Sequence, residues 1–137
     1  MATELAKAYT PAEVEPEVAA AWQEAAAFHA EAGGGGTPYS IVIPPPNVTA
    51  ALHMGHALNN TLQDILTRWR RMCGDNAMWM PGTDHAGIAT QTVVEKRVFA
   101  EEGKRRTDFE RDDFVSRIQA WKDEYEERIT AQLVAMG

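Results

Sequence analysis

Apolar residues at helical spacing predict three amphipathic helices, over residues 11–32, 53–73 and 107–136. The expected buried stripes are Val14, Val18, Ala21, Trp22, Ala25 and Phe28 in the first, Leu58, Leu62, Ile65, Leu66 and Trp69 in the second, and Phe114, Ile118, Trp121, Tyr125, Ile129 and Leu133 in the third. The third is either one long helix or two helices with a break near residues 126–127. A fourth helix is expected from about Ile88 to Glu102, because Gly103 interrupts it.

The residues next to these segments give the expected helix ends. Thr10 precedes Pro11 and stands three residues before Glu13, which predicts a capping box at the start of the first helix. Thr107 and Glu110 have the same spacing before the last helix. Gly74 follows the second helix as a C-cap.

Two short apolar runs without helical period predict strands, over residues 39–43 and 77–80. The first is a nearly continuous apolar run, which is typical of a buried central strand of a parallel sheet. Three prolines follow it, and Pro81-Gly82 follows the second. Strand, helix and strand in this order predict a right-handed βαβ unit of the α/β class, with ligands at the carboxyl ends of the strands.

Composition places these elements in a globular chain of 137 residues, with 45% hydrophobic and 24% charged residues. Gly33–Gly36 predicts a flexible linker, which divides the chain into residues 1–37, a helical extension, and residues 38–137. No apolar run approaches the roughly 20 residues of a membrane span, and the N-terminus lacks a signal-peptide layout. With its lone Cys73, the chain fits a reducing cytoplasm.

The net charge is −7, which argues against a chain that holds nucleic acid tightly by itself. Two short basic clusters exist, Arg68, Arg70 and Arg71, and Lys104, Arg105 and Arg106. We interpret them as cations near helix C-termini, where the helix dipole favours positive charge.

The strongest chemical signal lies after the first predicted strand, in the segment from Pro44 to His56. His53 and His56 stand at the opening of a helix, three residues apart and therefore on one face. A helix N-terminus attracts anions, and Gly55, which has no Cβ, lets a base or phosphate approach the backbone. These features predict a nucleotide-phosphate site in which the imidazoles stabilise charge on a reacting phosphate.

Two features of this segment allow another interpretation. His-x-x-His is also a zinc-ligand spacing, but Cys73 and His29 lie far away in the chain, so we expect no metal site. Asn59, one helical turn after His56, either bonds the nucleotide or is an ordinary polar helix residue.

The tetrapeptide His53-Met54-Gly55-His56 is similar to the "HIGH" signature of class I aminoacyl-tRNA synthetases. Pro44 to His56, together with Gly82-Thr83-Asp84-His85-Ala86-Gly87-Ile88-Ala89-Thr90-Gln91, resembles the valyl-tRNA synthetase family within that class. The resemblance extends over most of the chain and is weakest before Tyr39. It implies the first half of a Rossmann-like parallel sheet with flanking helices, preceded by an N-terminal helix that packs on the catalytic domain.

The same resemblance implies ATP-dependent activation of L-valine and transfer of the valyl group to tRNA(Val). Its catalytic residues would be His53 and His56, with His56 nearer the α-phosphate and His53 nearer the triphosphate tail. The expected ligands of ATP, which carries Mg²⁺, are His53, Gly55, His56 and Asn59. Those of the amino acid are Pro44, Pro45, Pro46, Asn47, Asp84, His85 and Gln91.

Within that set, the resemblance assigns Asp84 to the α-ammonium group of valine, with the prolines and Asn47 as the opposite wall. A carboxylate after a Gly-Thr turn is chemically suited to pair with an ammonium group. The alternative for Asp84 is a turn-forming residue whose side chain bonds the nearby backbone.

The chain departs from the family where it lacks a Lys-Met-Ser-Lys-Ser-like loop, an editing insertion and an anticodon domain. We therefore expect the missing C-terminal half to be a partner, and tRNA binding by this chain alone to be weak or absent. Locally, Ala50-Ala51 and Met54 replace the more usual Gly-Ser and Ile. Three functions stay open: a ligase fragment, an ATP- or aminoacyl-adenylate-binding module without turnover, and another nucleotidyltransferase with a His-x-Gly-His tetrapeptide.

Overall fold

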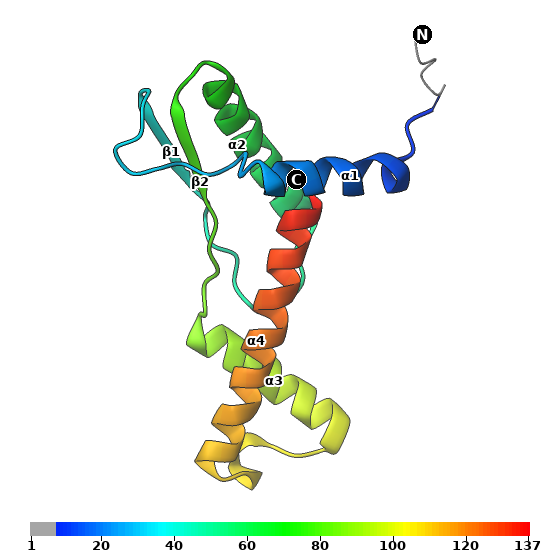
Figure 1. Cartoon of the computed structure of the whole chain (residues 1–137). Helices are drawn as coiled ribbons and strands as arrows, with labels where there is room; N and C mark the ends of the chain where they lie inside the picture. The colour runs from blue at the N-terminus through cyan, green and yellow to red at the C-terminus, as the bar shows by residue number, and fades with distance from the viewer. Residues whose placement is uncertain (1–7) are drawn as a thin grey trace. The chain divides into compact units, whose positions relative to one another are not determined.

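The computed structural model describes residues 8–137, whose internal contacts separate residues 8–34 from Gly35–Gly137. The elements in chain order are α1 (Pro11–Glu24), β1 (Pro38–Val42), α2 (Met54–Met72), β2 (Asn76–Met80), α3 (Gly87–Glu102), a short 3-10 helix (Arg106–Asp108) and α4 (Arg111–Ala135) (Figure 1). Helices together with a pair of parallel strands confirm the predicted α/β class. The division into functional domains after residue 37 stays a prediction.

Helix α1 begins at Pro11, as predicted. The expected capping box does not form, because the side chain of Thr10 makes no capping hydrogen bond to the backbone near Glu13. The rings of Trp22 and Phe28 make an edge-to-face contact, with centroids 5.4 Å apart. Their predicted role in packing on a catalytic domain stays a prediction.

Helix α1 ends at Glu24, well before the predicted residue 32. The chain turns there through a Schellman motif, in which the Ala26 N–H donates to the Gln23 carbonyl and the Ala27 N–H to the Trp22 carbonyl. Ala26 has a φ of 46°, in the left-handed region that usually holds glycine. This end could not be predicted, because three good helix formers, Ala25, Ala26 and Ala27, occupy the turn.

Strands β1 and β2 pair in parallel, from Pro38 opposite Asn76 to Val42 opposite Met80, and α2 connects them. This confirms the predicted strand, helix and strand, with bounds that differ by one residue. The expectation of a fully buried first strand is wrong, since Ile41 is half-buried and Val42 is 71% exposed. Within residues 8–137 each strand has one neighbour, and burial alternates along β1 because α2 covers one face of the sheet.

Helix α2 runs from Met54 to Met72, as predicted, but it packs on the strands with its polar side. Thr67, on that side, is almost fully buried. The indole N–H of Trp79 on β2 donates to the Gln63 side chain over 3.0 Å, and the Arg71 guanidinium donates to the Ala77 carbonyl over 3.0 Å. These hydrogen bonds therefore help to orient this helix on the sheet.

The apolar stripe predicted to be buried on α2 is exposed instead. Its members are Leu58, Leu62, Ile65, Leu66 and Trp69. Leu62 is 56% exposed and Trp69 is 53% exposed. At about 100° per residue the stripe lies on the opposite side of the helix from Gln63 and Thr67, which face the strands. Even so, no helix within residues 8–137 has the length and apolar character needed to cross a membrane.

Glycines shape the junction between α2 and β2. Gly74 follows the helix with a φ of 91°, so it takes the left-handed conformation predicted for a C-cap glycine. Gly36 lies directly against the Gly74 carbonyl, where an added Cβ would collide with it. The predicted linker therefore ends in a close backbone contact at the start of the sheet.

The basic clusters form ion pairs within the chain. Arg68 pairs with Asp64 over 2.7 Å, and Arg70 pairs with Asp75 over 2.5 Å. In the second cluster, Lys104 lies 3.5 Å from Glu102. These pairs agree with the interpretation of the clusters as cations near helix ends.

The hydrophobic core lies between α3 and α4, where Val94, Val98, Phe114 and Trp121 are buried together. Helix α4 is continuous, so the alternative with a break near residues 126–127 is wrong. Its predicted stripe is confirmed, since each member is buried or half-buried. Ile129, near its C-terminal end, is fully buried.

The second expected capping box is wrong. Thr107 lies inside the 3-10 helix, and α4 begins at Arg111 after Glu110, whose side chain makes no capping bond. The turn is held instead by Asp108, whose carboxylate accepts the Arg105 N–H over 2.8 Å. Helix α3 ends as predicted, because Gly103 takes a left-handed φ of 68°.

Candidate functional site

The loops that follow β1 and β2 stay paired beyond the sheet. Asn47 and Asp84 form an isolated parallel bridge, in which the Asp84 N–H donates to the Pro46 carbonyl over 2.9 Å. The Val48 N–H donates to the Asp84 carbonyl over 3.1 Å. The two segments predicted to bind the amino acid, whose residues Asn47 and Asp84 are 37 positions apart in sequence, are therefore neighbours at the carboxyl ends of the strands.

The histidine pair forms the start of α2. His53 is the N-cap residue, and its ring atom Nδ1 accepts the Gly55 N–H over 3.1 Å. The ring of His56 reaches back in turn, and its Nδ1 accepts the His53 N–H over 3.3 Å. The two imidazoles lie with their centroids 4.0 Å apart. This is a reciprocal capping box in which both capping side chains are histidines.

The capping bonds change which groups are able to meet an anion. The first N–H groups of α2 are largely used within the chain, because the His56 and Ala57 N–H groups both donate to the His53 carbonyl. Each neutral imidazole accepts at Nδ1, so its proton resides on Nε2. The site therefore offers two Nε2–H donors rather than the unpaired backbone N–H groups that we expected from the sequence.

The His53 ring explains why position 55 requires glycine. A Cβ at this position would lie 3.0 Å from Cε1 and 3.1 Å from Nδ1 of His53. Any other residue would therefore press on the capping ring. The expected approach of a nucleotide to Gly55 stays a prediction, and the space taken by the His53 ring is an independent requirement for glycine.

Burial, together with the nearby charge of His53, holds the pKa of His56 below its ordinary value. The folded chain therefore favours the neutral ring, the form in which Nδ1 accepts the capping bond. Because the folded-state pKa is lower than the unfolded value of about 6.5, the stability that the neutral ring contributes is complete above that pH. It is lost as the pH falls through the folded-state pKa.

We expect the chain to lose more stability between pH 7.5 and pH 5.5 than a His56→Gln variant, because glutamine keeps the capping bond and does not titrate. The measurement is the free energy of unfolding in urea at both pH values. The other titrating groups are common to the two proteins and cancel in the comparison. Equal losses in both would show that His56 is not coupled to folding.

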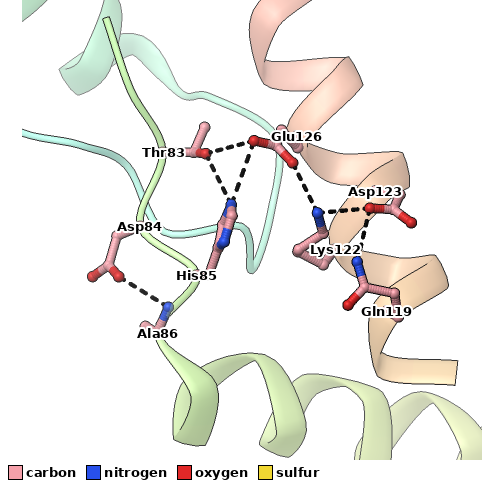
Figure 2. A network of polar contacts seen from close by, with 8 residues as sticks. All are labelled: Thr83, Asp84, His85, Ala86, Gln119, Lys122, Asp123 and Glu126. Carbon is pink, nitrogen blue, oxygen red and sulfur yellow. Dashed lines mark hydrogen bonds and ion pairs between the residues drawn. The ribbon is translucent and has the colours of Figure 1, made fainter. Parts of the chain in front are cut away.

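Asp84 and His85 point to different sides of their loop (Figure 2). One carboxylate oxygen of Asp84 accepts the Ala86 N–H over 3.0 Å, which is the turn-forming role considered as an alternative. This bond uses one side-chain oxygen, Oδ1, so turn formation and ammonium binding are compatible. His85 instead lies beside Glu126 of α4, with 3.4 Å between Nε2 and Oε1.

The other predicted ligands are spread around these loops. Pro46 is buried, whereas Pro44 and Pro45 are exposed. Asn59 is exposed on α2, one turn after His56. Gln91 is half-buried on α3, and its amide donates to Glu95 of the same helix over 2.7 Å. Among residues 8–137, no three His, Cys, Asp or Glu side chains are grouped so that they could hold a metal ion.

A set of polar contacts from α4 was missed in the sequence. Glu126 accepts the Thr83 hydroxyl over 3.2 Å and also pairs with Lys122 over 3.1 Å (Figure 2). The hydrogen bond from Lys122 and that from His85 hold the pKa of Glu126 below its ordinary value. Gln132 accepts the Leu52 N–H over 2.9 Å. The sequence feature that could have pointed to this contact is Gln132 itself, a polar residue next to the apolar stripe of α4.

A family model and individual relatives point to the same protein family. The family model described as tRNA synthetases class I (I, L, M and V) matches residues 17–137. The chain is 54% identical to the valine–tRNA ligase of Chlamydia pneumoniae over 131 residues, which are 96% of this chain and 14% of the relative. It is 55% identical to that of Geobacter sulfurreducens over 134 residues, 98% of this chain and 15% of the relative. It is 54% identical to that of Syntrophotalea carbinolica over 137 residues, 100% of this chain and 15% of the relative. The chain therefore spans about a seventh of the length of these relatives.

Proposed function

Because the chain belongs to the class I tRNA synthetase family of the isoleucine, leucine, methionine and valine enzymes, we propose that it works as part of a valine–tRNA ligase. Its reaction would be the ATP-dependent activation of L-valine, followed in the whole enzyme by transfer to tRNA(Val). The observation that carries this proposal is the bridge between Asn47 and Asp84, because it joins the loop of the histidine pair to the loop of the proposed ammonium ligand.

The proposed activation step is a displacement at phosphorus. A carboxylate oxygen of valine forms a bond to the α-phosphorus of ATP, while the bond from that phosphorus to the pyrophosphate oxygen breaks. Pyrophosphate leaves with the electrons of that bond, and the Mg²⁺ that ATP carries would neutralise phosphate charge. Such a transfer needs positioning and electrostatic stabilisation more than covalent help from the protein.

The histidine pair suits the phosphate side of this reaction. Nδ1 of each ring accepts a backbone N–H, which fixes the neutral tautomer and leaves Nε2–H as a donor. Donors that are held in place before the reaction stabilise charge on phosphate oxygens without reorganising. We assign His56 to the α-phosphate and His53 to the triphosphate tail.

Asp84 suits the amino-acid side. Its Oδ1 is held by the Ala86 N–H, which orients the carboxylate after β2. A charge-assisted pair with the α-ammonium group of valine would contribute about 1.5–3 kcal/mol. We assign Pro46 and Asn47, on the neighbouring loop, to the opposite wall.

A nuclear magnetic resonance titration tests the function directly. Amide and imidazole signals of the ¹⁵N-labelled chain are recorded with and without a non-hydrolysable valyl-adenylate analogue. Shifts concentrated at His53, His56 and Asp84 support the proposed site. Binding without pyrophosphate exchange would indicate a binding module without turnover, and a response to ATP that is independent of valine would favour another nucleotidyltransferase.

We also propose that the exposed stripe of α2 binds the part of the ligase that this chain does not span. The relatives carry about six-sevenths of their length outside the matched region, which supports this occupant. The stripe members Leu58, Leu62, Ile65 and Trp69 step by four, three and four residues, and the exposed Met72 continues this spacing three residues later. Sustained spacing of this kind is typical of a surface that packs on another helix.

We expect the double variant Leu62→Gln/Ile65→Gln to keep the stability of the chain within about 1 kcal/mol, because both side chains are already more than half exposed. The same variant should lose association with a polypeptide made of the unmatched part of the Chlamydia pneumoniae relative, measured by titration calorimetry. Gln63→Leu would not be a fair control, since Gln63 bonds Trp79.

A matched control changes two exposed apolar residues elsewhere. Phe99 on α3 and Val115 on α4 are exposed to a similar degree, so Phe99→Gln/Val115→Gln removes comparable apolar surface away from α2. This control should associate normally. Equal association by both double variants would contradict the assignment of the α2 stripe.

A further inference from the structure

Helix α4 reaches both site loops with polar side chains. The Trp121 indole N–H donates to the Val48 carbonyl over 2.9 Å in a buried contact. Gln132 accepts the Leu52 N–H over 2.9 Å, across 80 residues of sequence. Glu126 accepts the Thr83 hydroxyl over 3.2 Å. Two contacts thus fall on the loop after β1, and one falls on the loop after β2.

The contact at Leu52 lies next to the histidine pair. Leu52 directly precedes the N-cap residue His53, so its N–H lies outside the helix and has no intrahelical partner. Leu52 is half-buried, and a half-buried N–H without a partner costs free energy. Gln132 supplies that partner. It thereby holds the backbone at Leu52, immediately before the capping box of His53 and His56.

The contact at Thr83 lies next to Asp84. Glu126 holds the Thr83 hydroxyl and lies beside His85, while Lys122 on the preceding turn of α4 pairs with Glu126 (Figure 2). The loop is therefore fixed on both sides of Asp84. Asp84 itself keeps its bridge to Asn47.

We propose that α4 positions both site loops, with Gln132 as a positioning residue for His53 and His56 and Glu126 as one for Asp84. This inference rests on the function proposed above. It makes α4, which carries none of the residues assigned to ATP or valine, responsible for the relative placement of the two half-sites. Trp121 takes part as well, but its place in the core makes it unsuitable for a test.

The test compares Gln132→Met with Gln132→Glu in the whole chain without ATP or valine. Methionine has a similar length and cannot accept the Leu52 N–H well, whereas glutamate keeps an acceptor oxygen. We expect hydrogen exchange at the Leu52 amide to be about fivefold faster in Gln132→Met, as for loss of one ordinary hydrogen bond. Exchange in Gln132→Glu should remain close to that of the unchanged chain.

A second readout reports on the site itself. The ¹⁵N shifts of Nδ1 and Nε2 of His53 and His56 reveal the tautomer that the capping bonds fix. Gln132→Met should move these shifts toward a mixture of tautomers, whereas Gln132→Glu should leave them as they are in the unchanged chain. Gln119→Met is the matched control, because Gln119 lies on the same helix and its amide donates to the nearby Asp123 of that helix.

Glu126→Met tests the other loop in the same way. It should speed hydrogen exchange at the Ala86 amide, whose N–H donates to the Asp84 carboxylate, and leave the histidine shifts unchanged. Exchange at Val98, in the core between α3 and α4, reports global unfolding and separates it from a local change. Unchanged histidine shifts in Gln132→Met, or equal shifts in Gln119→Met, would overturn the proposal. These readouts need no substrate. Failure of the positioning role can therefore be distinguished from failure of the chain to bind a valyl-adenylate analogue.

Discussion

Replacing His56 by glutamine is expected to lower the rate of valyl-adenylate formation by about 10²–10³-fold, the usual loss when one preorganised donor to transition-state charge is removed. Glutamine keeps the start of α2, because a glutamine at this position can accept the His53 N–H as His56 does. The ring Nε2–H donor is lost, and the amide N–H of glutamine sits on a more flexible side chain that does not hold it in that position. The rate is measured as valine-dependent exchange of pyrophosphate into ATP. The chain is mixed for this measurement with the polypeptide made of the unmatched part of the Chlamydia pneumoniae relative.

His53→Ser gives the corresponding test at the cap. Serine is a good N-cap residue and can accept a backbone N–H of the first turn, so the helix start is kept while the imidazole is lost. We expect a loss of similar size, about 10²–10³-fold. His29→Gln is the control, since His29 is an exposed histidine within residues 8–34, where it pairs with Glu31. An unchanged rate in both site variants would remove the histidine pair from the mechanism.

Replacing Asp84 by asparagine is expected to weaken valine binding by roughly 10-fold to 150-fold, which corresponds to the loss of about 1.5–3 kcal/mol. Asparagine keeps the turn, because its side-chain oxygen can still accept the Ala86 N–H. The variant therefore separates the charge of Asp84 from its place in the backbone. The dependence of pyrophosphate exchange on valine concentration should shift, while the dependence on ATP should not.

Asp108→Asn is the matched control for that experiment. Asp108 also accepts a backbone N–H, that of Arg105, in a turn between α3 and α4. Its loss of charge should leave valine binding unchanged. If Asp84→Asn and Asp108→Asn behave alike, the carboxylate of Asp84 is only a turn former, and the assignment to the α-ammonium group fails.

Local chemistry made most of the elements predictable. The runs that became β1 and β2, the start of α2 at His53 and the left-handed glycines Gly74 and Gly103 all follow from residues a few positions away. Predictions that rested on a single polar side chain were less successful. Thr10 and Thr107 have capping-box spacing, but neither caps a helix, because spacing shows only that the bond is possible.

The site was predictable to the same extent. The sequence placed His53 and His56 at a helix start and Asp84 after a strand, and these positions are confirmed, while their chemical roles stay predictions. It could not show that the His53 ring accepts the Gly55 N–H and the His56 ring accepts the His53 N–H, which turns the expected backbone anion site into a pair of imidazole donors. It also gave no indication that Gln132 would meet Leu52, because a contact over 80 residues is decided by packing.

Neighbouring residues were enough to predict most local elements, the order strand, helix and strand, and the two loops at the strand ends. Which face of α2 meets the strands depends instead on contacts between distant parts of the chain. Apolar periodicity defines a stripe, but Leu62 and Thr67 lie on opposite sides of one helix, and it is the polar side, where Gln63 bonds Trp79, that faces the strands. Helical periodicity identifies the faces of a helix, whereas the neighbours available in the fold determine which face is buried.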